Sequence, residues 1–421
     1  MIAIFDADVP TALAFTRSLG RAGLRTRVYS HRPWPVARLS RYCREFARCP
    51  DPADAAHFLP WLEKEVRDGR IQLVAPTSDL IAFYVAELHE AFPREVRDLL
   101  PPPAAVLDAL FKDRFDQACA RHGFRTPWGA SPRSVAEARD LADTYRYPAI
   151  LKPKSHVGVG IERGEVVQNA AELRAAYRSY AIPPEQAAAC ARYPELRLPM
   201  IQEYVPGALQ NLYSVSGVLG ANGEVVAASA SRKTLQWPPT LGIGIEFHAS
   251  ADQELLSRGC ALASRIGRRG IFEVEFIRDA RTAELVAIDL NPRAHGFISF
   301  DIARNHDLPL LWQRLATGQA VPPAAPARDD LVWTHAVPFA ARRLAHRLKG
   351  RPVEPAPRAT VDIVNDVRDP LPSLPFLAVM LRHPGGLLRP FLRAPEGDSA
   401  APAGKSAAPD DEAQLAPMPT H

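Results

Sequence analysis

FEVEF at residues 272–276 and IDLNPR at residues 288–293 are two short apolar segments interrupted by polar side chains. Such segments predict two strands, and the polar residues between them predict the turn of a hairpin. Pairing the strands would bring Glu275 beside Asp289 on one face, with Asn291 two residues farther along and pointing the same way. Two carboxylates and an amide oxygen held this close repel one another unless a cation lies among them.

This set of oxygen ligands predicts a magnesium (or manganese) site. Carboxylate and amide oxygens suit Mg²⁺, which usually keeps several waters and shares the phosphates of a substrate. We therefore expect Glu275, Asp289 and Asn291 to bind the metal. Arg293 follows directly and is placed to hold a transferring phosphoryl group or an anionic intermediate. A surface hairpin with scattered acids is the alternative, but apolar neighbours flank every acid.

Length and composition are those of an ordinary globular protein. With 421 residues, of which 47% are hydrophobic and 23% charged, the chain is long enough for two or three domains. Its net charge of +4 is small and it has no helix-turn-helix or RNA-binding signature, so we expect no nucleic-acid partner. Five widely spaced cysteines without a C-x-x-C pair predict neither a zinc site nor a disulfide framework, and favour the reducing cytoplasm. We expect no signal peptide, because a strand begins at once, and no membrane span, because long apolar runs are absent.

The first hundred residues alternate between strand and helix patterns. Strands are predicted at residues 2–6, 24–29 and 71–75, with helices at 11–22 and 60–67. This alternation predicts an open parallel sheet whose ligand edge lies at the C-terminal ends of the strands. The first turn lacks the glycine fingerprint of a dinucleotide site, so we do not expect NAD or FAD. Three consecutive prolines end this unit.

The rest of the chain mixes helices with antiparallel strands. Helices are predicted at 104–122 and 170–180, strands at 148–153 and 198–204, and a hairpin at 211–231. A C-terminal extension, residues 323–394, contains a predicted strand at 332–337 and a basic helix at 339–348. Its apolar and basic stretch 376–393 is expected to pack back on the body, which we favour over docking to a membrane surface or a partner. Residues 395–421 are rich in Pro, Ala and Asp and predict a disordered tail.

Five features in this order resemble the ATP-grasp superfamily, and more closely its carboxylate–amine ligase branch. They are a sheet domain without a glycine fingerprint, Lys112, the strand that carries Lys152, the segment 202–205, and the polar hairpin. The resemblance covers roughly residues 1–320. It implies an α/β protein in which an N-terminal open parallel, Rossmann-like sheet domain, residues 1–103, precedes a two-subdomain α+β ATP-grasp fold. The first subdomain, 104–195, would carry the phosphate-binding lysines and loop, and the second, 196–322, the metal site.

The resemblance also implies that ATP is bound with Mg²⁺ (or Mn²⁺). Lys112 opens a helix and matches the first lysine of the family. Lys152 ends an apolar strand, where an unpaired ammonium would be costly without an anionic partner. The segment 155–160 looks like the mobile loop that covers the phosphates, with Gly158 and Gly160 letting backbone N–H groups approach phosphate oxygens. It has fewer glycines than in many members.

The segment Gln202-Glu203-Tyr204-Val205 resembles the linker between the two ATP-grasp subdomains. In the family its backbone usually reads the adenine edge, so Gln202, Glu203 and Val205 are assigned to ATP binding and the identity of the side chain matters little. Gln210 occupies the place where relatives often have an acid on the ribose hydroxyls, and an amide can make a similar hydrogen bond.

Arg232 and Lys233 are adjacent cations at the end of a strand that runs into a loop rich in Pro and Gly. Both cations would suit the γ-phosphate or an acyl phosphate, and a solvated basic pair is the alternative. Arg232, Lys152 and Arg293 form the expected catalytic set, and Lys112, Lys152 and Arg293 would compensate charge during phosphoryl transfer.

The resemblance implies an ADP-forming ligase. A substrate carboxylate would attack the γ-phosphate of ATP, and an amine would then displace phosphate from the acyl phosphate. The partners are then a small-molecule carboxylate and an amine, and a homodimer is compatible with this assignment. Two alternatives stay open: a non-catalytic ATP-binding regulator on the same fold, and an ATP-dependent kinase or synthetase that phosphorylates without ligation.

Overall fold

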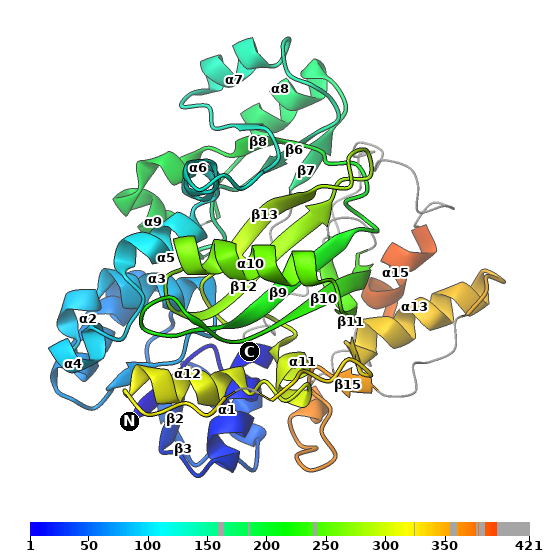
Figure 1. Ribbon diagram of the computed structural model, residues 1–421. Helices are drawn as coiled ribbons and strands as arrows, with labels where there is room; N and C mark the ends of the chain where they lie inside the picture. The colour runs from blue at the N-terminus through cyan, green and yellow to red at the C-terminus, as the bar shows by residue number, and fades with distance from the viewer. Residues whose placement is uncertain are drawn as a thin grey trace.

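The computed structural model of the protein describes residues 1–158, 164–183, 186–238, 242–323, 325–353, 360–375, 378 and 384–393. Within these ranges the strands form three sheets (Figure 1). The polar hairpin belongs to the largest sheet, and the predicted lysine strand belongs to a smaller sheet.

The N-terminal sheet is parallel, with the strand order β3-β2-β1-β4. Its strands are β1 (Ile2–Ile4), β2 (Thr26–Ser30), β3 (Glu45–Arg48) and β4 (Leu73–Val74), and its longer helices are α1 (Pro10–Arg21), α2 (Ala55–Arg67) and α3 (Asp79–Glu87). The parallel arrangement agrees with the expected open sheet. β3 was not predicted, because its four residues begin and end with charged side chains and offer only a weak apolar pattern.

A smaller sheet, β5-β8-β6-β7, carries the predicted lysine strand. Its strands are β5 (Gly129–Ala130), β6 (Ala149–Lys152), β7 (Glu165–Val167) and β8 (Met200–Glu203), and α7 (Val135–Leu141) and α8 (Ala170–Ser179) contribute to a core with it. The expected boundary at residue 195 assigned β8 to the following subdomain. β8 instead pairs with β5 and β6, so this sheet extends to residue 203.

The predicted helix 104–122 is divided at Phe111. The two parts are α5 (Pro103–Leu110) and α6 (Lys112–Arg121), and Phe111 between them has an extended backbone, with φ −105° and ψ 112°. The Phe111 side chain is fully buried, and the backbone N–H of Lys112 donates to the carbonyl of Lys154 at 2.7 Å. The break therefore makes Lys112 the first residue of α6 and fastens it to the chain just beyond β6.

The largest sheet has the order β13-β12-β9-β10-β11-β14-β15. Its strands are β9 (Leu212–Leu219), β10 (Val225–Trp237), β11 (Ile243–Ser250), β12 (Gly270–Arg278), β13 (Leu285–Asn291), β14 (Val332–Thr334) and β15 (Thr360–Asp362). Helix α10 (Gln253–Ile266) packs on one face (Figure 1). Helices α11 (Ile298–Ala303) and α12 (Leu308–Ala316) follow the polar hairpin, and α12 packs between this sheet and α1.

The hairpin of β12 and β13 has the register that the sequence predicts. Glu275 lies opposite Asp289, and Glu273 lies opposite Asn291. Residues directly opposite on antiparallel strands share a face of the sheet. All four polar side chains therefore lie on one face, away from α10.

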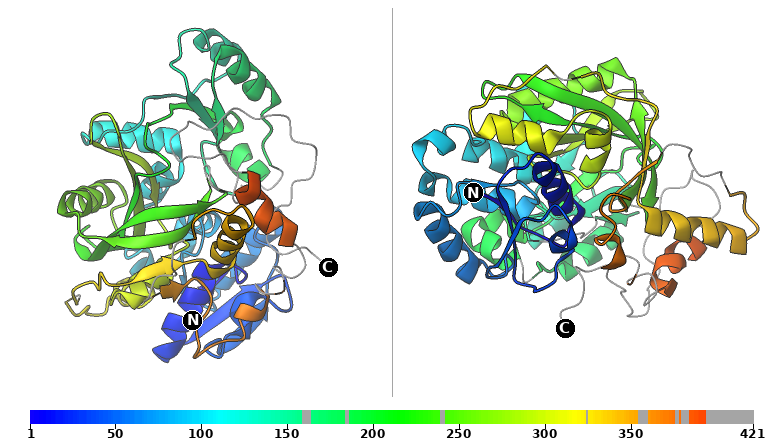
Figure 2. Two further views of the ribbon diagram at one scale, coloured as in Figure 1. Left: turned by 90° about the vertical axis from the view of Figure 1, so that its right-hand side faces the viewer. Right: turned by 90° about the horizontal axis from the view of Figure 1, so that it is seen from below.

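The C-terminal extension adds β14 and β15 to the large sheet and carries helices α13 (Ala336–Leu348) and α15 (Pro384–Arg393). α13 and α15 lie side by side (Figure 2). Leu388, Phe391 and Leu392 of α15 pack against α13 and the large sheet, as expected for the described part of 376–393. The predicted tail 395–421 lies outside the described residues. In the part of the chain that the structure describes, no helix combines the length and apolar character that a membrane crossing requires.

Candidate active site

A buried ion pair joins the first predicted lysine to the hairpin. Lys112 Nζ lies 2.8 Å from Asp289 Oδ2, and the two side chains are only 6% and 14% exposed. Burial alone would raise the pKa of Asp289, but Lys112 and other nearby cations lower it to about 2. Asp289 is therefore ionised, and it is held by a cation from another part of the fold.

Lys152, at the end of β6, faces the same cluster. Burial, and then the charge of Lys112, lower its pKa to about 8, while Asp289, Asp116 and Glu275 oppose this shift. Burial also raises the pKa of Asp116 to about 6. Asp116 was not predicted as a site residue, although its spacing of four residues from Lys112 on a helix places both on one side of α6.

The carboxylates of the hairpin repel one another as expected. Burial, and then the negative charge of Glu273, raise the pKa of Glu275 well above its ordinary value, although Lys233 opposes the shift. A divalent cation would relieve this repulsion. Glu275, Asp289 and Asn291 supply only oxygen ligands from one face, which fits Mg²⁺ or Mn²⁺. Among the described residues, no group of three or more His, Cys, Asp or Glu side chains is placed to hold a metal ion. Mg²⁺ usually keeps several waters and shares the phosphates of a substrate.

Asn291 is held from both sides. Its Nδ2 donates to Glu273 Oε2 at 3.1 Å, and its Oδ1 accepts from Arg293 Nη2 at 3.0 Å. Glu273 also accepts from Ser214 Oγ at 2.9 Å. Glu273 was not predicted as a site residue, although its spacing of two residues from Glu275 places both side chains on the same face of β12.

Arg293 connects this cluster to the N-terminal sheet domain. Its Nε and Nη2 donate to the two carboxylate oxygens of Asp79, at 2.8 and 3.0 Å, and Asp79 is the first residue of α3. Burial alone would lower the pKa of Arg293, but the Asp79 carboxylate raises it above its ordinary value. The guanidinium is therefore permanently charged and fixed at the edge of the candidate site.

The structure places Arg232 and its neighbour Lys233 on different faces of the large sheet. Arg232 is exposed, its guanidinium donates to the carbonyl of Gln210, and it lies opposite Tyr213 on the α10 face of the sheet. The next residue, Lys233, points to the other face, where Glu275 and Glu273 oppose the lowering of its pKa by burial. Strand alternation puts the two cations on opposite faces, and only Lys233 faces the acids.

The predicted adenine linker is described, and its side chains are directed to several different neighbours. Gln202 is buried on β8 opposite Ile150, and Val205 is buried in a small apolar cluster. Glu203 accepts from Arg281 Nη2 at 2.8 Å, so its side chain is used in an ion pair. Gln210 is partly buried and its carbonyl accepts from Arg232.

The predicted phosphate loop is described only as far as Gly158, which has a positive φ of 73° and so suits glycine. The prediction for Gly160 lies outside the described residues. His156 of this loop lies against the cluster, where Lys112, and then burial, lower its pKa to about 4. A cavity of about 10 Å³, lined by His156, Lys112, Asp79, Asp289 and Asn291 among others, lies between them.

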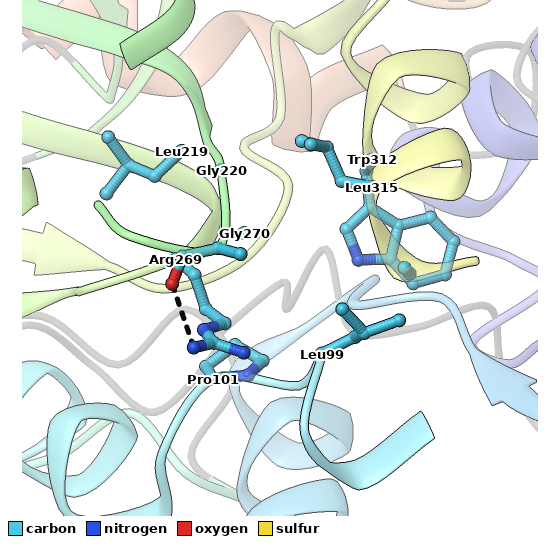
Figure 3. Close-up of a pocket in the computed structure, with 10 residues that line it drawn as sticks. Leu99, Pro101, Leu219, Gly220, Arg269, Gly270, Trp312 and Leu315 are labelled. Carbon is cyan, nitrogen blue, oxygen red and sulfur yellow. Dashed lines mark hydrogen bonds between the residues drawn. The ribbon is translucent and has the colours of Figure 1, made fainter. Parts of the chain in front are cut away.

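A second small cavity lies away from this cluster, between the N-terminal domain, the large sheet and α12 (Figure 3). It measures about 20 Å³ and is lined by Leu99, Pro101, Leu219, Arg269 and Trp312 among others. Such a volume holds about one water molecule. We therefore regard it as a junction between packed elements.

The sequence comparison relates about half of the chain to one enzyme subunit. The large chain of carbamoyl phosphate synthase from Deinococcus radiodurans is 26% identical over 229 residues, which are 52% of this chain and 20% of that protein. The chain thus spans about a fifth of the length of the curated relative that it matches. No family model matches the chain.

Solved structures match most of the chain. Biotin carboxylase from Campylobacter jejuni, in a βγ-ATP complex, gives a TM-score of 0.58 at 18% identity and covers 76% of this chain and 72% of its own. N5-carboxyaminoimidazole ribonucleotide synthetase from Thermus thermophilus gives 0.56 at 19% identity, covering 78% and 81%. L-amino acid ligase from Bacillus licheniformis gives 0.54 at 15% identity, covering 75% and 73%. The chain therefore shares its fold with these structures, in agreement with the ATP-grasp fold that its sequence predicts.

Proposed function

We propose that this protein is an ATP-dependent, ADP-forming ligase that activates a small-molecule carboxylate for attack by an amine. One observation carries the proposal. Lysines from two separate elements, Lys112 of α6 and Lys152 of β6, converge on the carboxylate face of the β12–β13 hairpin. A site that gathers ammonium groups around a cluster of oxygen ligands suits a metal-bound triphosphate.

The nucleotide would lie between the small and the large sheet. Lys112 and Lys152 would bind the phosphates, with the backbone of Gln202, Glu203 and Val205 at the adenine, Gln210 at the ribose, and the loop at Gly158 and Gly160 over the phosphates. Mg²⁺ (or Mn²⁺), bound by Glu275, Asp289 and Asn291, would neutralise charge on the triphosphate. Lys112 would exchange Asp289 for a phosphate oxygen when ATP enters, because both are anionic oxygen acceptors at the same ammonium.

The chemical step consists mostly of positioning and charge compensation. The substrate carboxylate attacks the γ-phosphorus, the bond to the β-phosphate breaks, and ADP leaves. The amine nitrogen then attacks the acyl carbon, loses a proton and expels phosphate. Lys152, Lys233 and Arg293 would stabilise the charge that shifts between oxygens. Lys233 replaces Arg232 in this set because it faces the acids.

Amino acids form the first panel of acids and amines, because the chain resembles the structure of an L-amino acid ligase. A cytoplasmic location, where ATP is abundant, is part of the proposal. So is a homodimer, which the relative described as a biotin carboxylase domain dimer from Hydrogenobacter thermophilus suggests.

The test is ADP release in a matrix of carboxylates and amines, with Mg²⁺ and ATP. We expect ADP release that depends on one acid, and a hydroxamate when hydroxylamine replaces the amine, because hydroxylamine captures an acyl phosphate. The Glu275→Ala/Asp289→Ala double variant should lose ADP release while keeping its circular dichroism spectrum.

Two results would contradict the proposal. ATP binding without ADP release across the whole matrix would favour a non-catalytic regulator on the same fold. A stable phosphorylated product that neither an amine nor hydroxylamine consumes would favour a kinase.

A further inference from the structure

The candidate site is tied to the N-terminal domain by an unbroken chain of polar contacts. Starting in the large sheet, Ser214 donates to Glu273, and Asn291 donates to the other oxygen of Glu273. Arg293 donates to Asn291 Oδ1, and it also holds both oxygens of Asp79. The contacts are 2.8 to 3.1 Å long, and Arg293 and Asp79 are 214 residues apart.

This chain of contacts fixes which way the Asn291 amide points. An amide presents an N–H₂ group on one side and an oxygen on the other. A carboxylate, Glu273, lies on one side and a guanidinium, Arg293, on the other, so only one orientation satisfies both. The orientation directs Nδ2 to Glu273 and Oδ1 to Arg293, and Oδ1 keeps a second lone pair for another partner.

Most N–H donors of the Arg293 guanidinium already have an acceptor. A guanidinium has five N–H donors. Nε donates to Asp79, Nη2 donates to Asp79 and to Asn291, and Nη1 donates to the carbonyl of Ala294. Within the described residues four donors are therefore used, which leaves one on Nη1 for a substrate oxygen.

Hydrogen bonds also hold the segment that carries Asp79. The backbone N–H of Ala294 donates to the carbonyl of Pro76 at 2.9 Å, which holds the end of β4 against the residue after Arg293. Ser78 and Thr77 donate to Asp6, at the end of β1, at 2.6 and 3.2 Å. Asp79 thus lies on a segment that these hydrogen bonds hold at the edge of the parallel sheet.

On this geometry we propose that Asp79 is a positioning residue that acts through Arg293 to fix the orientation of the Asn291 amide, so that the second lone pair of Oδ1 is available to the metal. The inference rests on the proposed function, since it assumes that Asn291 is a metal ligand. Residues that orient metal ligands commonly change metal affinity ten- to a hundredfold when they are replaced. The N-terminal domain therefore contributes to the metal site without touching the metal.

The experiment measures Mn²⁺ binding to the full-length protein in the presence of a non-hydrolysable ATP analogue, from the electron paramagnetic resonance signal of free Mn²⁺. We expect Asp79→Asn to weaken Mn²⁺ binding by about tenfold. In an Arg293→Met background, Asp79→Asn should have no further effect, because the residue acts through Arg293. Asp79→Glu, which keeps the charge on a longer arm, should fall between Asp79→Asn and the wild type.

Asp369→Asn is the matched control. Asp369 is also a buried carboxylate that holds an arginine, Arg17 Nε at 2.8 Å, but it belongs to the C-terminal extension. The Asp369→Asn variant should lose about as much thermal stability as Asp79→Asn and keep the wild-type affinity for Mn²⁺.

Three results would overturn the inference or its basis. Mn²⁺ affinity within about twofold of wild type in both Asp79 variants would overturn it. The inference would also be overturned if Asp79→Asn weakened Mn²⁺ binding equally in the wild-type and Arg293→Met backgrounds. Failure of the wild-type protein to bind Mn²⁺ with the nucleotide would instead refute the proposed function.

Discussion

Replacing Lys112 by methionine tests the ion pair at the centre of the candidate site. The pKa of Asp289 is depressed from 3.8 to about 2, so its ionised form stabilises the fold above pH 3.8 and this contribution is lost as the pH falls toward 2. At pH 7 the contribution is fully present, and the shift corresponds to about 2 kcal/mol. Removing Lys112 also leaves a carboxylate that is 14% exposed without its cation. We therefore expect Lys112→Met to lower the free energy of unfolding by about 3 kcal/mol.

Mg²⁺ should replace part of the stabilisation that the Lys112 ammonium gives to the Asp289 carboxylate. Without Lys112, Asp289 and Glu275 face each other with less compensation, so Mg²⁺ alone should bind more tightly than in the wild type. A ligand at ten times its dissociation constant stabilises a protein by about 1.4 kcal/mol. In urea unfolding at pH 7, Mg²⁺ should therefore raise the stability of Lys112→Met by about 1 kcal/mol more than that of the wild type.

Lys154→Met is the matched control for this experiment. Lys154 is equally buried, but its nearest carboxylate is Asp113, with Nζ 3.9 Å from Oδ2. This variant should lose stability without gaining sensitivity to Mg²⁺. Wild-type stability of Lys112→Met, or the same Mg²⁺ response in all three proteins, would refute the reasoning.

Three further results follow from the site. Because Lys152 has a pKa of about 8 and only its protonated form binds phosphate, the KM for ATP should rise above pH 8 by up to about tenfold per pH unit, and Lys152→Arg should flatten this profile. Lys233→Met should lower kcat by about a hundredfold, whereas Arg232→Ala, on the other face of the sheet, should change it by less than about twofold; the reverse order would contradict the placement of the two cations. Glu203→Ala should leave ATP affinity within about twofold in calorimetry, because the side chain serves Arg281; a large loss would show that the carboxylate itself contacts the nucleotide.

The arrangement of the hairpin was predictable because it depends only on residues close together in the sequence. Alternation along each strand fixes which side chains share a face, and one turn then brings Glu275 opposite Asp289. The same rule placed Glu273 beside Glu275, although it was not assigned a role. The general fold also followed from local patterns, since alternating strands and helices predict a parallel sheet.

Other features depend on contacts that no local pattern contains. The choice between Arg232 and Lys233 required the register of β10 against β9. Alternation alone puts the two side chains on opposite faces but does not say which face the hairpin acids share. The break at Phe111 depends on burial of that ring and on the contact of Lys112 with Lys154. The Asp79–Arg293 pair joins residues 214 positions apart, and only the docking of the two domains brings them together.

The most direct measurement is a calorimetric titration of ATP into the protein with and without Mg²⁺. The wild-type protein should bind ATP more tightly when Mg²⁺ is present, and the Glu275→Ala/Asp289→Ala variant should retain its fold but lose this dependence on the metal. Equal enhancement by Mg²⁺ in the two proteins would contradict a metal-bound triphosphate on this face of the hairpin.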